Sequence, residues 1–65
     1  MNRIVMRTER TSLHQAEDGH FFLTSPRGNY YQVDPTKPEL FQVCAIWLGL
    51  TVDGLCKVID GQRKE

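Results

Sequence analysis

The residues that could carry chemistry are few and scattered along a chain of 65 residues. Two cysteines, Cys44 and Cys56, and two histidines, His14 and His20, lie far apart, whereas a structural zinc site uses close pairs of the C-x-x-C kind. The chain has no G-x-S-x-G, P-loop, glycine-rich dinucleotide fingerprint or H-E-x-x-H motif. We therefore expect no catalytic residues, no metal and no cofactor, and we predict that the chain is not an enzyme.

The cysteines and the hydropathy of the chain also bear on its compartment. A disulfide-stapled protein of this size usually carries more cysteines, so two buried thiols in a reducing compartment are expected. The first residues contain no apolar signal-peptide segment. The longest apolar run, between Val43 and Leu50, is far shorter than the roughly 20 residues that span a membrane. These features predict a cytoplasmic protein without a membrane span.

Charge and size restrict the classes of partner. The chain has 8 basic and 8 acidic residues, divided 4 against 4 in residues 1–36 and 4 against 4 in residues 37–65. Neutrality argues against a polyanion-binding tail, because counterion release requires an excess of Lys and Arg. The chain is long enough for a single domain, 1–65. The free energy that such a domain gains by burying apolar surface is roughly equal to the cost of its lost conformational entropy. We therefore expect a second copy or a partner to stabilise it.

Residues 1–34 form the β-rich half of the predicted domain. Strand patterns lie at 3–8, 20–24 and 29–33, and glycine-containing turns precede the last two. In the last hairpin we expect Leu23 opposite Tyr30 and Phe22 opposite Tyr31, because aromatic cross-strand pairs stabilise such ribbons.

Residues 11–17 are ambiguous. A strand there would pair with residues 20–24 through a turn at Gly19. A short helix is the alternative, because Ser12-x-x-Gln15 resembles a capping box. We favour the strand, so the first half becomes an antiparallel meander of three or four strands.

Residues 38–61 form the helical half. Pro38 suits the first turn of a helix, and apolar residues then recur at helical spacing: Leu40, Val43, Cys44, Trp47 and Leu48. Phe41, Ala45 and Ile46 are also apolar, so this helix must be covered on more than one side. Gly49 is expected to end it as a left-handed cap.

Thr51 is expected to N-cap a second helix. Its predicted buried stripe consists of Val52, Leu55, Cys56 and Ile59, with Val58 at the edge. Gly61 is placed to cap its C-terminus. The fold class is therefore α+β, a small antiparallel β-meander followed by two helices arranged like a helix-turn-helix.

Residues 41–60, FQVCAIWLGLTVDGLCKVID, resemble the helix-turn-helix of the Cro and phage-repressor type. Ala45 falls where that family has a small residue that lets the helices cross closely. Gly49 falls at the family's turn glycine. Apolar residues fall at its buried positions: Cys44, Leu48, Leu50, Leu55 and Val58.

The resemblance implies a small, phage-like transcriptional regulator that binds double-stranded DNA as a homodimer. In such proteins the N-terminal part of the second helix meets base edges in the major groove, and nearby cations hold phosphates. The residues that would contact DNA are Thr51, Val52, Asp53, Cys56, Lys57, Arg63 and Lys64.

The alternative function belongs to another class, a small protein that binds and modulates another protein without DNA contact. It would act like a phage inhibitor of a host or defence protein, or like an antitoxin module. The partner or dimer surface would include Phe41, Ile46, Tyr30 and Tyr31.

Charge placement separates the two hypotheses. Basic residues beside the second helix would favour DNA, and the candidates are Arg3, Arg7, Lys57, Arg63 and Lys64. A helix face occupied by Asp53 and Asp60 without them would favour a protein partner. Arg3, Arg7 and Arg10 could instead form a basic arm on DNA, but we favour their role as charges that protect an edge strand.

Overall fold

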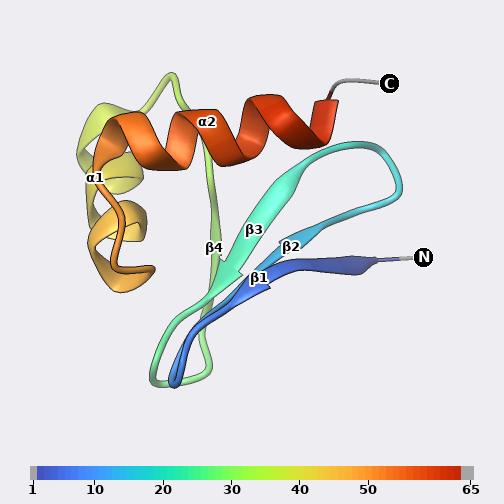
Figure 1. Cartoon of the computed structure of the whole chain (residues 1–65). Coiled ribbons are helices and arrows are strands. Elements are labelled where there is room, and N and C mark those ends of the chain that lie inside the picture. The colour runs from blue at the N-terminus through green and yellow to red at the C-terminus, as the bar shows by residue number, and fades with distance from the viewer. Residues whose placement is uncertain (1, 64–65) are drawn as a thin grey trace.

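The structure is a computed structural model that describes residues 2–63, with Arg63 described by its backbone alone. Its elements in chain order are β1 (Arg3–Arg7), β2 (Ser12–Gln15), β3 (Phe21–Thr24), β4 (Tyr30–Gln32), α1 (Pro38–Trp47) and α2 (Val52–Arg63) (Figure 1). The predicted α+β arrangement is confirmed, because an antiparallel 4-stranded sheet is followed by two helices.

The strands form a meander in the order β1-β2-β3-β4. Residues 12–15 are a strand, so the helix alternative for this segment is wrong. The pairing of Leu13 with Leu23 explains why this segment forms a strand, since both side chains become fully buried in the sheet. Gly19, with φ of 94°, adopts the left-handed conformation in the turn between β2 and β3. A bulge between Ile4 and Met6 interrupts the pairing of β1 with β2.

The β3–β4 hairpin differs by one residue from the predicted register. Leu23 lies opposite Tyr31 rather than Tyr30, and Phe22 lies opposite Gln32 rather than Tyr31. Tyr31 therefore shares the helix-facing side of the sheet with Leu23, while Tyr30 points to the opposite face.

The turn geometry accounts for this register. The Ser25 N–H donates to the Asn29 carbonyl at 2.8 Å, and the Gly28 N–H donates to the Ser25 carbonyl at 2.9 Å. The loop consequently consists of residues 26–28, and Gly28 has a φ of 87°. The left-handed Gly28 agrees with the predicted glycine turn, but a type I turn closed by such a glycine encloses three loop residues, one more than the predicted pairing of Leu23 with Tyr30 leaves room for.

The face of α1 that is buried also differs from the predicted stripe. Its core residues are Phe41, Cys44 and Ala45, followed by Leu48 directly after the helix, whereas Val43 is 39% exposed. A helix that is apolar nearly all round offers several faces of similar hydrophobicity. The helical spacing of apolar residues does not show which of these faces is buried. That depends on which face packs against the sheet.

The connection between the helices follows the prediction. Gly49 has a φ of 72°, as expected for a left-handed cap. The Thr51 hydroxyl accepts a hydrogen bond from the Gly54 N–H at 3.0 Å and so N-caps α2. Leu55 and Ile59 then enter the core.

Two expectations for α2 are wrong. Val52 is 41% exposed, because the first turn of the helix extends past the core. Gly61 does not end the helix; it lacks the left-handed φ, and α2 continues to Arg63. In this last turn Arg3 of β1 donates to the Gln62 side chain, which ties the end of α2 to the edge of the sheet.

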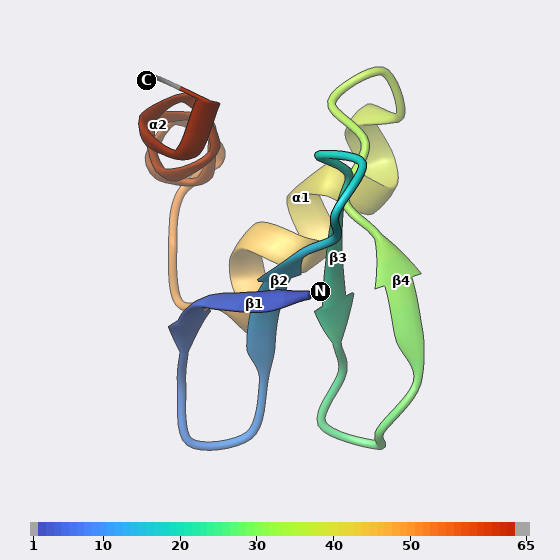
Figure 2. The ribbon, with the colours of Figure 1, turned by 90° about the vertical axis from the view of Figure 1, so that its right-hand side faces the viewer.

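Both helices lie on one side of the sheet. Figure 2 views the other side, with α1 passing behind the strands and α2 seen along its axis at the upper left, above β1. The core between the layers is built from Leu13, Phe21 and Leu23 of the strands, from Val33 directly after β4, from the buried residues of the two helices, and from Leu48 after α1. Within residues 2–63, no single helix meets the length and hydropathy of a membrane span; only α1 and α2 together do, across a 90° bend.

Candidate functional site

The two helices meet at a right angle, the first feature relevant to DNA binding. Their axes differ by 90°, and residues 48–51 join them. Ala45 is 1% exposed at this junction, and its carbonyl accepts a hydrogen bond from the Leu50 N–H at 2.8 Å. Helix-turn-helix motifs join two helices at a similar angle through a turn of roughly three to four residues.

The residues expected to contact DNA do not all lie on the surface of α2. Thr51, Val52, Asp53 and Lys57 are exposed, whereas Cys56 is half-buried against the core. The side chain of Arg63 and the whole of Lys64 lie outside the described residues.

The described charges on α2 are mostly acidic. Asp53, Lys57 and Asp60 are exposed at spacings of four and three, so they occupy neighbouring positions on one helix surface. Arg3 reaches the last turn of α2 but hydrogen-bonds to Gln62. Arg7 pairs with Ser12 and points to the other side of the sheet. The described part of the chain therefore brings no cluster of cations beside the first turns of α2.

The outer face of the sheet, which the helices leave uncovered, carries a row of aromatic rings. We define it as His14, Phe22 and Tyr30, from three adjacent strands, with Ile4 of β1 beside His14. The rings of His14 and Phe22 stack with centroids 4.9 Å apart and planes 9° from parallel. Phe22 and Tyr30 meet edge to face at 5.8 Å. Tyr30 is 74% exposed and Ile4 49% exposed.

Hydroxyl groups hold the His14 ring in this row. The Ser12 Oγ lies 2.7 Å from its Nε2, and the Thr24 Oγ1 lies 3.4 Å from the same atom. A ring fixed in this way loses little side-chain entropy when a partner covers it. The predicted partner surface contained none of Ile4, His14 and Phe22, although alternation along the strands places all three on one face once the register is known.

The four residues of the predicted partner surface lie in different parts of the structure. Phe41 is only 3% exposed in the core, so its assignment to a surface is wrong. Tyr31 is half-buried and packs on Trp47 with ring centroids 5.1 Å apart. Ile46 is 64% exposed on α1, and Tyr30 points from the opposite side of the sheet. The outer-face row contains Tyr30 alone of the four.

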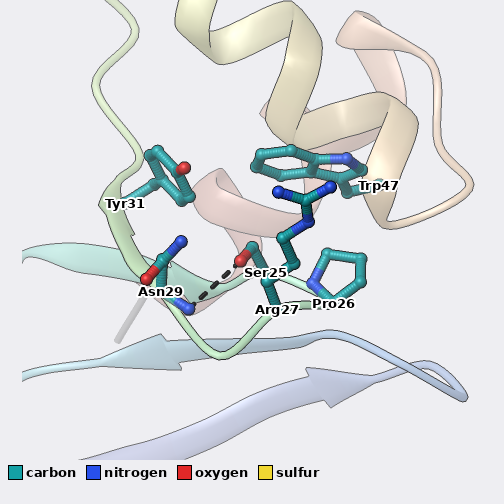
Figure 3. A pocket seen from close by; sticks show the side chains of 6 residues that line it. All are labelled: Ser25, Pro26, Arg27, Asn29, Tyr31 and Trp47. Atoms are coloured by element: carbon teal, nitrogen blue, oxygen red, sulfur yellow. Dashed lines mark hydrogen bonds between the residues drawn. The ribbon is translucent and has the colours of Figure 1, made fainter.

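A cavity of about 370 Å³ lies where the β3–β4 turn meets the end of α1. Its lining consists of Ser25, Pro26, Arg27, Asn29, Tyr31 and Trp47. Figure 3 shows the Arg27 guanidinium beside the Trp47 indole, with Tyr31 across from them. The buried Ser25 hydroxyl accepts a hydrogen bond from the Asn29 N–H at 3.2 Å, which holds the turn in place. No sequence pattern predicts this cavity, because α1 and the β3–β4 turn are distant in the chain.

Within residues 2–63, no three His, Cys, Asp or Glu side chains come together in a group that could hold a metal ion. Cys44 is buried, and this burial raises the pKa of its thiol above the ordinary value. Comparisons of the chain with models of protein families, with curated proteins and with solved structures find no match.

Proposed function

We propose that this protein is a small module that binds another protein through the outer face of its sheet. The observation that supports the proposal is the row of His14, Phe22 and Tyr30, which lies uncovered across three strands. Interface centres are rich in aromatic residues and poor in charge, and single anchoring rings supply much of their binding energy. The partner of this face carries an apolar, uncharged patch.

The chemistry of this face supports a protein partner over a nucleic acid. Arg7 is the one charged residue that the described strands β1 to β4 direct to this side. A surface that binds single-stranded nucleic acid combines stacking rings with several cations along the backbone path. One arginine at the rim of the row does not supply that path, whereas an uncharged protein patch needs no such cations.

The test compares Phe22→Ser with Ile46→Ser, which removes an exposed apolar side chain of α1 instead. A partner protein that co-purifies with the wild type is isolated, and its affinity for the wild type and for each variant is measured by calorimetry. We expect Phe22→Ser to weaken binding by at least about tenfold, the loss typical of an aromatic anchor, and Ile46→Ser to leave it unchanged. Equal affinities of wild type and Phe22→Ser would refute the proposal.

DNA binding is the second candidate, favoured by the right angle between α1 and α2 and by the exposed first turn of α2. It predicts that Lys57→Ala combined with Arg63→Ala weakens binding to the promoter region of its own gene and flattens the salt dependence. A gel shift over a series of salt concentrations, beside light scattering for a dimer, measures both. An unchanged salt slope would rule out this role for the helix pair.

A further inference from the structure

The free edge of the sheet at β4 lies next to the cavity lined by Tyr31, Trp47 and Arg27. The sheet order ends at β4, and Figure 2 shows no helix or other strand of the described chain along its outer edge. The opposite edge, β1, is protected by a bulge, by Arg7 and by the bond between Arg3 and Gln62. β4 contains no charged residue.

The hydrogen-bond pattern shows which backbone groups of β4 are free. The Ser25 N–H bonds to the Asn29 carbonyl, and the Val33 N–H bonds to the Phe21 carbonyl at 2.9 Å. Antiparallel ladders alternate, so residue 31 bonds inward to β3. The N–H and C=O groups of Tyr30 and Gln32 therefore point outward from the edge.

An added strand would place one of its side chains at the cavity. A residue opposite Tyr31 on a new antiparallel neighbour shares its face, with Cβ atoms about 5 Å apart. That face is the helix-facing side, where Tyr31 lines the cavity together with Trp47. Addition of a peptide strand commonly draws affinity from the backbone bonds and specificity from such a side-chain pocket.

The charge of the cavity indicates which peptide side chain it would bind. Arg27 is the one charged residue of the lining, and it makes no ion pair within the described chain. The Asn29 amide and the Ser25 hydroxyl are further polar groups there, while Tyr31 and Trp47 offer flat apolar walls. We propose that the β4 edge binds an extended peptide segment as a fifth strand and that the cavity takes its central acidic side chain, with Arg27 holding the carboxylate.

This proposal rests on the proposed protein-binding function but uses different residues, so the two can fail separately. The probe is a short, capped peptide of threonines and valines with one central glutamate, and matched peptides carry glutamine or lysine there. Titrations followed by NMR give the dissociation constants and the backbone shifts of residues 30–32. We expect the glutamate peptide to bind about tenfold more tightly than the glutamine peptide, because a charged acceptor strengthens the bond.

Variants of the protein assign the carboxylate to Arg27. Arg27→Glu is expected to reverse the preference, so that the lysine peptide binds better than the glutamate peptide. Arg10→Ala, in the exposed turn between β1 and β2, removes an arginine away from the cavity and should leave both affinities unchanged. An unaltered preference in Arg27→Glu would overturn the assignment.

Methylation of the peptide backbone tests the added strand itself. N-methyl groups on the two residues that flank the glutamate block the bonds to Tyr30 and Gln32 and should abolish binding. An N-methyl group on the glutamate, whose N–H points away from β4, should have little effect. Equal binding of both methylated peptides would overturn the fifth strand. If no peptide binds while Phe22→Ser still loses the protein partner, this inference fails and the proposed function stands.

Discussion

Side-chain hydroxyl groups form hydrogen bonds with backbone groups at the ends of several helices and strands. The Thr11 Oγ1, buried between the layers, donates to the Trp47 carbonyl at 3.2 Å and joins the β1–β2 turn to the end of α1. The Thr51 hydroxyl caps α2, and the Ser25 hydroxyl holds the β3–β4 turn. Each satisfies a backbone group that an element end leaves without a partner in its own helix or strand.

The two thiols should differ in reactivity. Cys44 is fully buried and its pKa is raised by that burial, so little reactive thiolate forms at mildly alkaline pH. Cys56 is only half-buried. We expect Ellman's reagent to modify Cys56 first and Cys44 only as fast as the domain opens.

Cys56→Ala provides the control for this experiment, since it leaves only the buried thiol. The variant should react slowly in buffer and rapidly in denaturant. Fast reaction of Cys44 in the folded variant would contradict its position in the core.

At the level of the helices, glycine has a different conformation after α1 than in the last turns of α2. Gly49 has a positive φ that other residues adopt at a cost, with open space where a Cβ would lie. Gly61 also has open space around its Cβ position but lies within α2 in a helical conformation. Their substitution should therefore have opposite effects on stability.

Gly49→Ala should lower the free energy of unfolding by about 1 kcal/mol, because alanine is strained in the left-handed conformation. Gly61→Ala should raise it by about 0.5 kcal/mol, because alanine favours the helix. Urea denaturation followed by circular dichroism measures both. A destabilised Gly61→Ala would mean that α2 ends at Gly61, as its sequence pattern suggested.

On the scale of the whole molecule, one layer of helices covers one face of a small sheet. The buried residues form a single cluster, and other apolar residues pack around it, among them Trp47 and Tyr31. The outer face of the sheet is not covered by the described helices. In a domain this small, each large side chain at the border of the core contributes a considerable part of the stability.

Trp47→Ala should lower the free energy of unfolding by about 3 kcal/mol, since it removes the ring that packs on Tyr31 and the core. Its neighbour Ile46 is exposed, so Ile46→Ala should change stability by less than about 1 kcal/mol. Chemical denaturation of both variants measures the difference. Equal stability of the two would show that Trp47 does not anchor α1 to the sheet.

Much of the fold could be predicted from local patterns. The strands, the turn at Gly19, the end of α1 at Gly49 and the cap at Thr51 were predicted correctly, because each depends on neighbouring residues and backbone sterics. The register of the β3–β4 hairpin was missed by one residue, because the turn at Gly28 holds one residue more than assumed.

Local sequence patterns were enough to predict the helices and strands and their order, and the residue counts establish the neutral balance of charge. The packing of the helices on the sheet determined which face of α1 is buried, since Phe41 and Val43 are both apolar and Phe41 is the one that enters the core. It also decided which cations meet α2 and that Arg27 lies beside Trp47. Such features depend on contacts between segments far apart in the chain, and local periodicity carries no information about them.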